Sequence, residues 1–197
     1  MSDGFSSTEP VYKVTLLGDG AVGKTSLRDR FMGKAFPTEY LMTIGADFAA
    51  KSIEIEGRRV KFQIWDLAGQ PRFEMVREMY YKGALGGLLV FDVTRPYSFE
   101  NTMSWIREVW GHNGKGRIPL VLLGNKIDLR SQFPMFVRSE QAEQLAKGLS
   151  EICSSDGFSI PYIETSAKTG ENVEEAFSAL GTAVGSYITK QIGRIGA

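Results

Sequence analysis

Short apolar runs and longer amphipathic stretches follow one another along the whole chain. Four runs have the length and composition of strands that are buried on both faces, and they lie at 12–17, 87–93, 120–123 and 162–165. Two further segments, 53–56 and 60–64, alternate apolar and polar residues on either side of Gly57, which predicts a β-hairpin. Apolar residues at helical spacing recur over 142–149 and 173–184. The chain is therefore of the α/β class.

The order of these elements predicts one domain with three layers. Strands that are buried on both faces belong to a parallel sheet, and helices must cover its two sides. We expect a six-stranded, mostly parallel sheet, in which the hairpin supplies one antiparallel pairing. No linker-like segment interrupts the pattern, so we assign residues 11–190 to the domain, 1–10 to a flexible N-terminal tail and 191–197 to a C-terminal tail. In such sheets, ligands bind beyond the carboxyl ends of the strands.

Composition narrows the classes of partner. Lysine plus arginine and aspartate plus glutamate both number 23, so the chain has no net positive charge that would attract nucleic acid. Cys153 is the only cysteine, which excludes an internal disulfide and suits a reducing compartment. No apolar run reaches the roughly 18 to 20 residues of a membrane span. We expect a cytoplasmic monomer.

Two positions bear on lipid attachment. Myristoylation requires glycine at position 2, where this chain has Ser2. Prenylation requires a cysteine near the C-terminus, and the last five residues, 193–197, contain none. We therefore expect no lipid anchor in this chain, and contact with a membrane only through partners.

The segment 18–25 is the strongest motif in the chain. It has the spacing Gly-x-x-x-x-Gly-Lys-Thr and lies between a predicted strand and a predicted helix. In this motif glycines turn backbone N–H groups toward phosphates, Lys24 reaches the β- and γ-phosphates, and the Thr25 hydroxyl binds Mg²⁺. The motif indicates a nucleoside triphosphate but does not select the base. Its expected binding residues are Asp19, Gly20, Ala21, Val22, Gly23, Lys24, Thr25 and Ser26.

A second motif follows the alternating strand at 60–64. Asp66 stands near the end of this strand and is expected to hold Mg²⁺, directly or through water. Gly69 lets the backbone approach a γ-phosphate, and Gln70 can orient the attacking water. Pro71 comes next, and its missing N–H and stiff backbone leave the geometry of hydrolysis open.

The segment 125–128, Asn-Lys-Ile-Asp, indicates guanine as the base. Guanine presents two donors at one edge, N1–H and the 2-amino group, and the carboxylate of Asp128 can accept both. Adenine has an unprotonated N1 there, so its lone pair would face the carboxylate. Lys126 can lay its stem along the base, and Asn125 can connect neighbouring loops. After the last strand, backbone donors for guanine O6 are expected from Ser166, Ala167 and Lys168.

Together these motifs resemble those of the Ras superfamily of small GTPases. They occur in the family's order, and the resemblance extends from residue 12 to residue 188. The segments 43–48, 65–70 and 80–84 are most similar to those of the Rab branch. The resemblance implies the P-loop NTPase fold and two switch segments, one around Thr43 and one around Gly69.

The resemblance also implies roles for single residues. Thr43 would bind Mg²⁺ through its hydroxyl and the γ-phosphate through its N–H, and Phe36 would stack edge-on against guanine, unless Phe36 is simply a core residue. The expected catalytic residues are Gln70, Lys24 and Thr43. The expected metal ligands are Thr25, Thr43 and Asp66. The aromatic residues that would present the switches to effectors are Phe48, Trp65 and Tyr80, unless Phe48 is simply a core residue.

We therefore predict a switch protein that binds GTP and GDP with Mg²⁺ and hydrolyses GTP slowly until a GTPase-activating protein assists. An exchange factor and effectors would be its other partners. No arginine lies between Phe36 and Thr43, the region where Gα proteins carry a built-in arginine. Two alternatives differ in class: an interaction module that keeps GTP bound because Pro71 disrupts the water geometry, and an ATP-dependent kinase. Gln70 argues against the first alternative, and Asp128 argues against the second.

Overall fold

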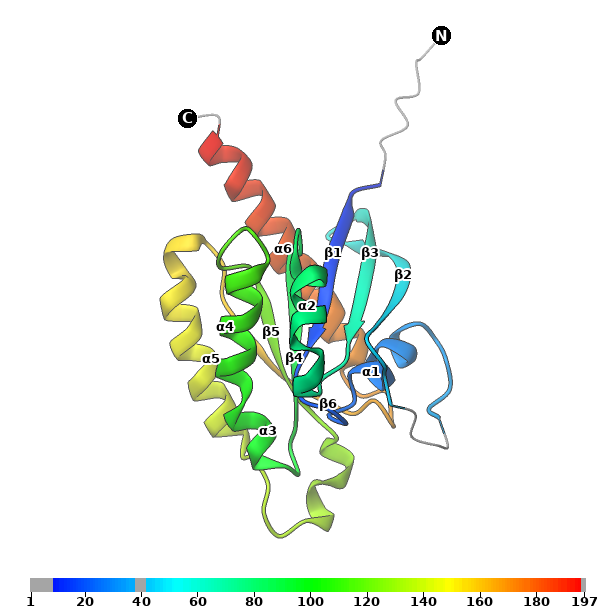
Figure 1. The fold of residues 1–197 in the computed structure, drawn as a ribbon. Helices are drawn as coiled ribbons and strands as arrows, with labels where there is room; N and C mark the ends of the chain where they lie inside the picture. Colours follow the sequence, from blue (N-terminus) through cyan, green and yellow to red (C-terminus); the bar gives the residue numbers. More distant parts are fainter. Residues whose placement is uncertain (1–8, 38–41, 196–197) are drawn as a thin grey trace.

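A computed structural model of the chain describes residues 9–37 and 42–195. Its centre is one six-stranded sheet in the order β2-β3-β1-β4-β5-β6 (Figure 1). The strands are β1 (Val11–Leu17), β2 (Ala46–Ile55), β3 (Arg58–Leu67), β4 (Gly86–Asp92), β5 (Leu120–Asn125) and β6 (Tyr162–Thr165). Only β2 and β3 pair antiparallel, and the other neighbouring strands are parallel. The predicted sheet is confirmed.

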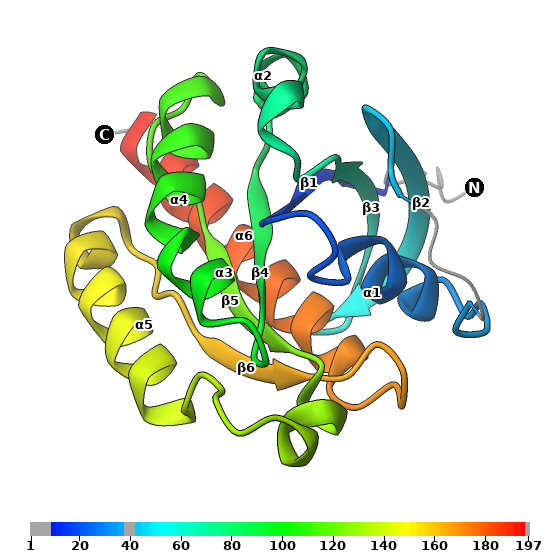
Figure 2. The same ribbon diagram turned by 60° about the horizontal axis from the view of Figure 1, so that its bottom comes forward.

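Helices cover both faces of the sheet, as Figure 2 shows. One face carries α1 (Lys24–Phe31) and α6 (Val173–Ile195). The other carries α2 (Glu74–Tyr81), α4 (Thr102–His112) and α5 (Ser139–Cys153). The short helices are η1 (Pro71–Phe73), α3 (Pro96–Glu100), η2 (Ile127–Gln132) and η3 (Ser154–Asp156). Within the described residues, no helix is long and apolar enough to cross a membrane.

The extent to which a strand is buried depends on its position in the sheet. All residues of β4 are buried, because this strand is central and helices pack on both of its sides. β2 forms the edge of the sheet, and most of its residues are only partly buried or exposed. The predicted apolar stripe of α6 is buried throughout, at Val173, Ala176, Phe177, Leu180 and Val184. The helix itself includes 191–195, which the sequence pattern had assigned to a tail.

The sheet order brings the loops that follow β1, β4 and β5 close together. β1 pairs with β4, and β4 pairs with β5, in parallel register. Their carboxyl ends therefore meet at one end of the sheet, opposite the end at which β1 begins and α6 finishes (Figure 1). This is the end of the sheet where the sequence places its nucleotide-binding motifs.

We predict that Phe177→Ala destabilises the domain by about 3–5 kcal/mol. The Phe177 ring is fully buried and stacks on Phe31 with ring centroids 3.8 Å apart, so its removal leaves a large cavity between α6 and α1. Chemical denaturation monitored by circular dichroism measures this loss. Ser178→Ala, on the exposed side of the same helix, serves as the control and should change the free energy of unfolding by less than about 0.5 kcal/mol.

Candidate nucleotide-binding site

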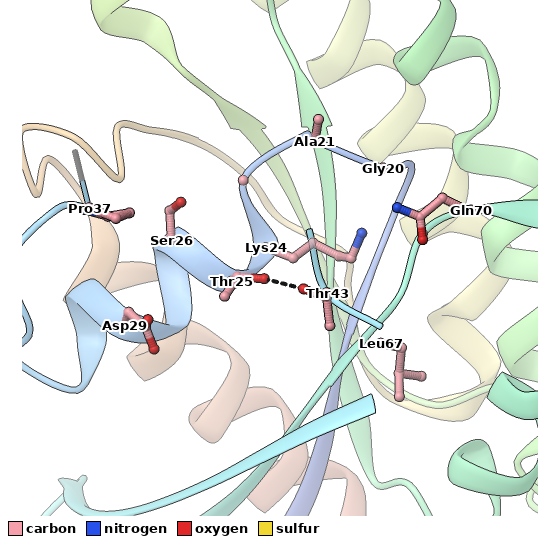
Figure 3. A pocket seen from close by; sticks show the side chains of 12 residues that line it. Gly20, Ala21, Lys24, Thr25, Ser26, Asp29, Pro37, Thr43, Leu67 and Gln70 are labelled. Atoms are coloured by element: carbon pink, nitrogen blue, oxygen red, sulfur yellow. Dashed lines mark hydrogen bonds between the residues drawn. The ribbon is translucent and has the colours of Figure 1, made fainter. Parts of the chain in front are cut away.

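Two adjoining pockets lie at the carboxyl end of the sheet. The first has a volume of about 150 Å³ and lies against the loop between β1 and α1, with residues of both switch segments on its wall (Figure 3). The second has a volume of about 260 Å³ and lies against the loops after β5 and β6. Gly23 and Ser26 line both pockets, so the two pockets adjoin.

The phosphate loop, residues 18–25, surrounds the first pocket with its backbone. Gly23 has φ of +102°, and a Cβ atom there would lie 2.3 Å from Nδ2 of Asn125, so only glycine fits. Asn125 donates from this nitrogen to the Val22 carbonyl at 2.8 Å, and Lys126 donates from Nζ to the Ala21 carbonyl at 2.7 Å. The loop after β5 therefore holds the phosphate loop from outside.

Lys24 supplies the positive charge in the first pocket. Its side chain is buried, and its ammonium donates to the carbonyls of Gly18 at 2.7 Å and Asp19 at 2.8 Å. Burial lowers the pKa of Lys24 to about 8, although Asp66 and the charge of Asp19 partly oppose this shift. A desolvated ammonium of this kind is stabilised by an anion, and phosphate is the anion that the surrounding N–H groups suit.

Three oxygen-bearing side chains meet below Lys24. The hydroxyl oxygens of Thr25 and Thr43 are 2.7 Å apart (Figure 3). Thr25 also donates to Oδ2 of Asp66 at 2.5 Å. Oδ1 of Asp66 is buried and has no hydrogen-bond partner among the described residues. Burial raises the pKa of the Asp66 carboxyl, an effect that Thr25 and Lys24 partly oppose. Two hydroxyls and an under-coordinated carboxylate are a donor set that fits Mg²⁺.

The second switch segment closes the far side of the first pocket. Gly69 packs directly on the phosphate loop, because a Cβ atom there would lie 2.5 Å from the Gly20 nitrogen. Gln70 also lines the pocket, and its Oε1 is buried without a hydrogen-bond partner among the described residues. Pro71 is the first residue of η1, a position where a missing N–H leaves no helical hydrogen bond unmade. The proline is therefore compatible with a Gln70 side chain that faces the pocket.

Arg77 fixes the start of the second switch segment to α4. Its guanidinium donates to the carbonyls of Ala68 at 3.2 Å and Gln70 at 2.9 Å. The same group makes two bonds with the carboxylate of Glu108, at 2.7 and 3.0 Å, and lies 4.4 Å from the Trp105 ring centroid. No motif in the sequence indicates this role of Arg77, because a contact between α2 and α4 leaves no local pattern.

The second pocket contains the residues that were expected to recognise guanine. Asp128 accepts a hydrogen bond from the Ser166 hydroxyl at 2.6 Å, which orients the carboxylate. Asn125 accepts from the Thr165 hydroxyl and the Ala167 N–H, so it connects the loops after β5 and β6. The Ala167 N–H, which was expected to donate to guanine O6, is therefore bonded to Asn125 in this structure. The predicted residues that line this pocket are Gly23, Ser26, Phe36, Asn125, Lys126, Asp128, Ala167 and Lys168.

Three predicted binding residues line neither pocket with their side chains. Asp19 turns toward α4, where it accepts hydrogen bonds from Trp105 and Asn101, both at 2.8 Å. Val22 is buried in the core. The Ser166 hydroxyl donates to Asp128, and its N–H, which was expected to donate to guanine O6, donates to the Glu171 carbonyl at 3.1 Å instead. The predicted residues that line the first pocket are Gly20, Ala21, Gly23, Lys24, Thr25, Ser26, Thr43, Gly69 and Gln70.

A phosphate loop between the first strand and helix of a parallel sheet, beside a hydroxyl and carboxylate cluster, defines the class of P-loop nucleotide-binding proteins. Within this class, the sequence profile of the Ras family matches residues 13–186. The chain belongs to the Ras family of small GTPases.

Several Rab proteins are similar to the chain over most of its length. It is 43% identical over 170 residues to Ras-related protein Rab-13 of Rattus norvegicus, covering 86% of this chain and 78% of that protein. It is 41% identical over 181 residues to Ras-related protein RABA2a of Arabidopsis thaliana, covering 92% and 78%. It is 42% identical over 170 residues to Ras-related protein Rab-8B of Homo sapiens, covering 86% and 76%. The chain is thus a Rab-like small GTPase, an enzyme that hydrolyses GTP.

We predict that Arg77→Ala lowers the free energy of unfolding by about 3–5 kcal/mol, because it leaves Glu108 charged and nearly buried without its cation. Thermal and chemical denaturation measure the loss. Arg72→Ala is the matched control, since Arg72 lies on the same segment but contacts only the Phe73 ring among the described residues. If the two variants were equally stable, the pair between Arg77 and Glu108 would not anchor the segment.

Proposed function

We propose that the two pockets bind GTP and GDP together with Mg²⁺, and that the chain alternates between a GTP state and a GDP state. The observation that carries this proposal is the convergence of Lys24, Thr25 and Gln70 around one pocket, with Asp66 bonded to Thr25 behind it. This pocket adjoins the one that Asp128 lines. Phosphates would lie in the first pocket, and the guanine base would lie in the second. Family membership supports the activity, and the geometry supports the assignment of residues.

In this proposal the chain's own residues position the reactants. The N–H groups of the phosphate loop and Lys24 hold the β- and γ-phosphates, and Thr25, Thr43 and Asp66 would hold Mg²⁺. Bound Mg²⁺ neutralises charge on the phosphate oxygens. Gln70 orients a water for in-line attack on the γ-phosphate. Because both switch segments contribute groups to this pocket, loss of the γ-phosphate would release them.

Partners would recognise the surface next to the switches. Trp65 contacts Phe48 and Tyr80, with ring centroids 5.1 and 5.0 Å away. Ile44 and Met75, on the first and second switch segments, expose 75% and 83% of their surface. We propose that effectors, an exchange factor and a GTPase-activating protein bind here, and that such partners bring a cytoplasmic protein to membranes.

The alternative of a module that only retains GTP receives no support from the comparisons.

The experiment that tests hydrolysis is single-turnover release of phosphate from bound GTP. We expect a rate on the order of 10⁻⁴–10⁻³ s⁻¹ without a partner, the range for which Ras is the known example of this class. Gln70→Leu should lower the rate at least about tenfold, because the attacking water loses its orienting group, while binding of GDP persists. A rate near about 1 s⁻¹ in the unassisted wild-type protein, far above the Ras example, would contradict the proposal, and so would a rate indistinguishable from background.

A second experiment tests the base. Asp128→Asn should shift preference from GDP to XDP by a few kcal/mol, because xanthine keeps N1–H but carries a carbonyl in place of the 2-amino donor. An amide, with one acceptor and one donor, matches that pattern. Competition binding with both nucleotides measures the shift, and Asp156→Asn, on the remote η3, is the control. A folded Asp128→Asn variant that keeps its full preference for GDP would show that Asp128 does not recognise the base.

A further inference from the structure

Arg95 contacts the phosphate loop from an element that carries none of the nucleotide-binding motifs. It lies in the turn between β4 and α3, 75 residues from the loop, and its Nη2 donates to the Gly20 carbonyl at 2.9 Å. Its Nε donates to Oδ2 of Asp92 at 3.1 Å. The guanidinium thus bridges the carboxyl end of β4 and the backbone of the phosphate loop.

The Asp92 carboxylate is held in one position by several hydrogen bonds. The carboxylate is buried and also accepts from Lys126 at 2.7 Å and from the N–H and hydroxyl of Thr94 at 2.9 and 2.7 Å. Burial alone would raise the pKa of Asp92, but the hydrogen bonds from Lys126 and Thr94 outweigh it and lower the pKa. One fixed carboxylate therefore positions two cations, Arg95 and Lys126.

The two cations and Asn125 donate hydrogen bonds to three consecutive carbonyls of the phosphate loop. Arg95 binds the carbonyl of Gly20, Lys126 binds that of Ala21, and Asn125 binds that of Val22. In a planar trans peptide, the carbonyl of one residue and the N–H of the next point in opposite directions. A carbonyl that is held outward therefore holds the following N–H inward. Arg95 controls the N–H of Ala21 in the same way that Lys126 and Asn125 control the next two.

We propose that Arg95 is a positioning residue of the phosphate site, which keeps the peptide between Gly20 and Ala21 oriented toward the nucleotide and thereby slows nucleotide release. The proposal rests on the function proposed above, namely a nucleotide in these pockets. Lys126 and Asn125 belong to the base-recognition motif, whereas Arg95 belongs to no motif. Its side chain is 44% exposed, so the contact can be removed without opening the core.

The test is the rate at which GDP labelled with a methylanthraniloyl group leaves the Mg²⁺-loaded protein in excess unlabelled GDP. Arg95→Ala should release the label about tenfold faster, because one charge-assisted hydrogen bond to the loop is lost. Arg95→Lys should give an intermediate rate, since an ammonium can contact either the carbonyl or Asp92 but lacks the guanidinium fork that joins both. Single-turnover hydrolysis of preloaded GTP is measured on the same samples, so that an effect on retention of the nucleotide is distinguished from an effect on the transferred phosphoryl group.

Arg107→Ala is the control, because Arg107 is exposed on the neighbouring α4 and no hydrogen bond or ion pair is seen for it among the described residues. It should release GDP at the wild-type rate.

Release from Arg95→Ala at the wild-type rate would overturn the proposal. A tenfold loss of hydrolysis with unchanged release would also overturn it, because Arg95 would then act on the transferred phosphoryl group. If Arg95→Ala does not fold, the rate of GDP release from Arg95→Lys tests the proposal instead, and a rate equal to that of the wild type would overturn it. Failure of the wild-type protein to bind labelled GDP would refute the proposed function instead.

Discussion

The site depends on one constraint, which is that consecutive carbonyls of the phosphate loop must point away from the ligand. A planar peptide offers its N–H to a phosphate only when its carbonyl is directed outward, and an outward carbonyl near the protein interior needs a donor. The donors come from the carboxyl ends of β4 and β5, through Arg95, Lys126 and Asn125. This arrangement requires β1, β4 and β5 to be adjacent and parallel, as the sheet order makes them. The sheet order is thus a condition for the phosphate binding proposed above, because it brings these donors to the carbonyls of the phosphate loop.

The same contacts couple the two pockets. Asn125 and Lys126 line the pocket proposed for the base, yet their side-chain nitrogens hold the loop that surrounds the pocket proposed for phosphates. A base that displaced Lys126 would therefore disturb the phosphate loop as well. Asp92 carries this coupling, since its carboxylate holds Lys126 and Arg95 together. In the proposed function, recognition of the base and retention of the phosphates are then linked through this one buried carboxylate.

Local patterns in the sequence predicted the sheet and most of the residues that line the two pockets, because strand periodicity and phosphate-loop chemistry depend on neighbours along the chain. Asp29, Pro37, Leu67 and Leu129 also line the pockets and were not among the predicted binding residues. β2 was predicted only from 53, yet it begins at Ala46, because pairing with β3 compensates for a segment without clear alternation. The direction of the Asp19 side chain, toward Trp105, depends on a contact across 86 residues. Arg77 and Arg95 were missed for the same reason. Each acts on backbone carbonyls of another segment, and such contacts leave no spacing that a motif can record.

The two sides of the phosphate pocket are held by different kinds of contact. On one side, buried side chains that bond to fixed strands hold the phosphate loop. On the other side, the hydrogen bonds of the Thr43 side chain are to Thr25 and Asp66, which are themselves the proposed metal ligands. Next to it, Ile44 has most of its surface in solvent. Thr43 and Ile44, which the structure describes, make few buried contacts, so this part of the segment has little local stability of its own. Its position then depends on what occupies the pocket, which is the physical condition for a switch. The phosphate loop, in contrast, is held by contacts within the protein, as the proposed binding of either nucleotide requires.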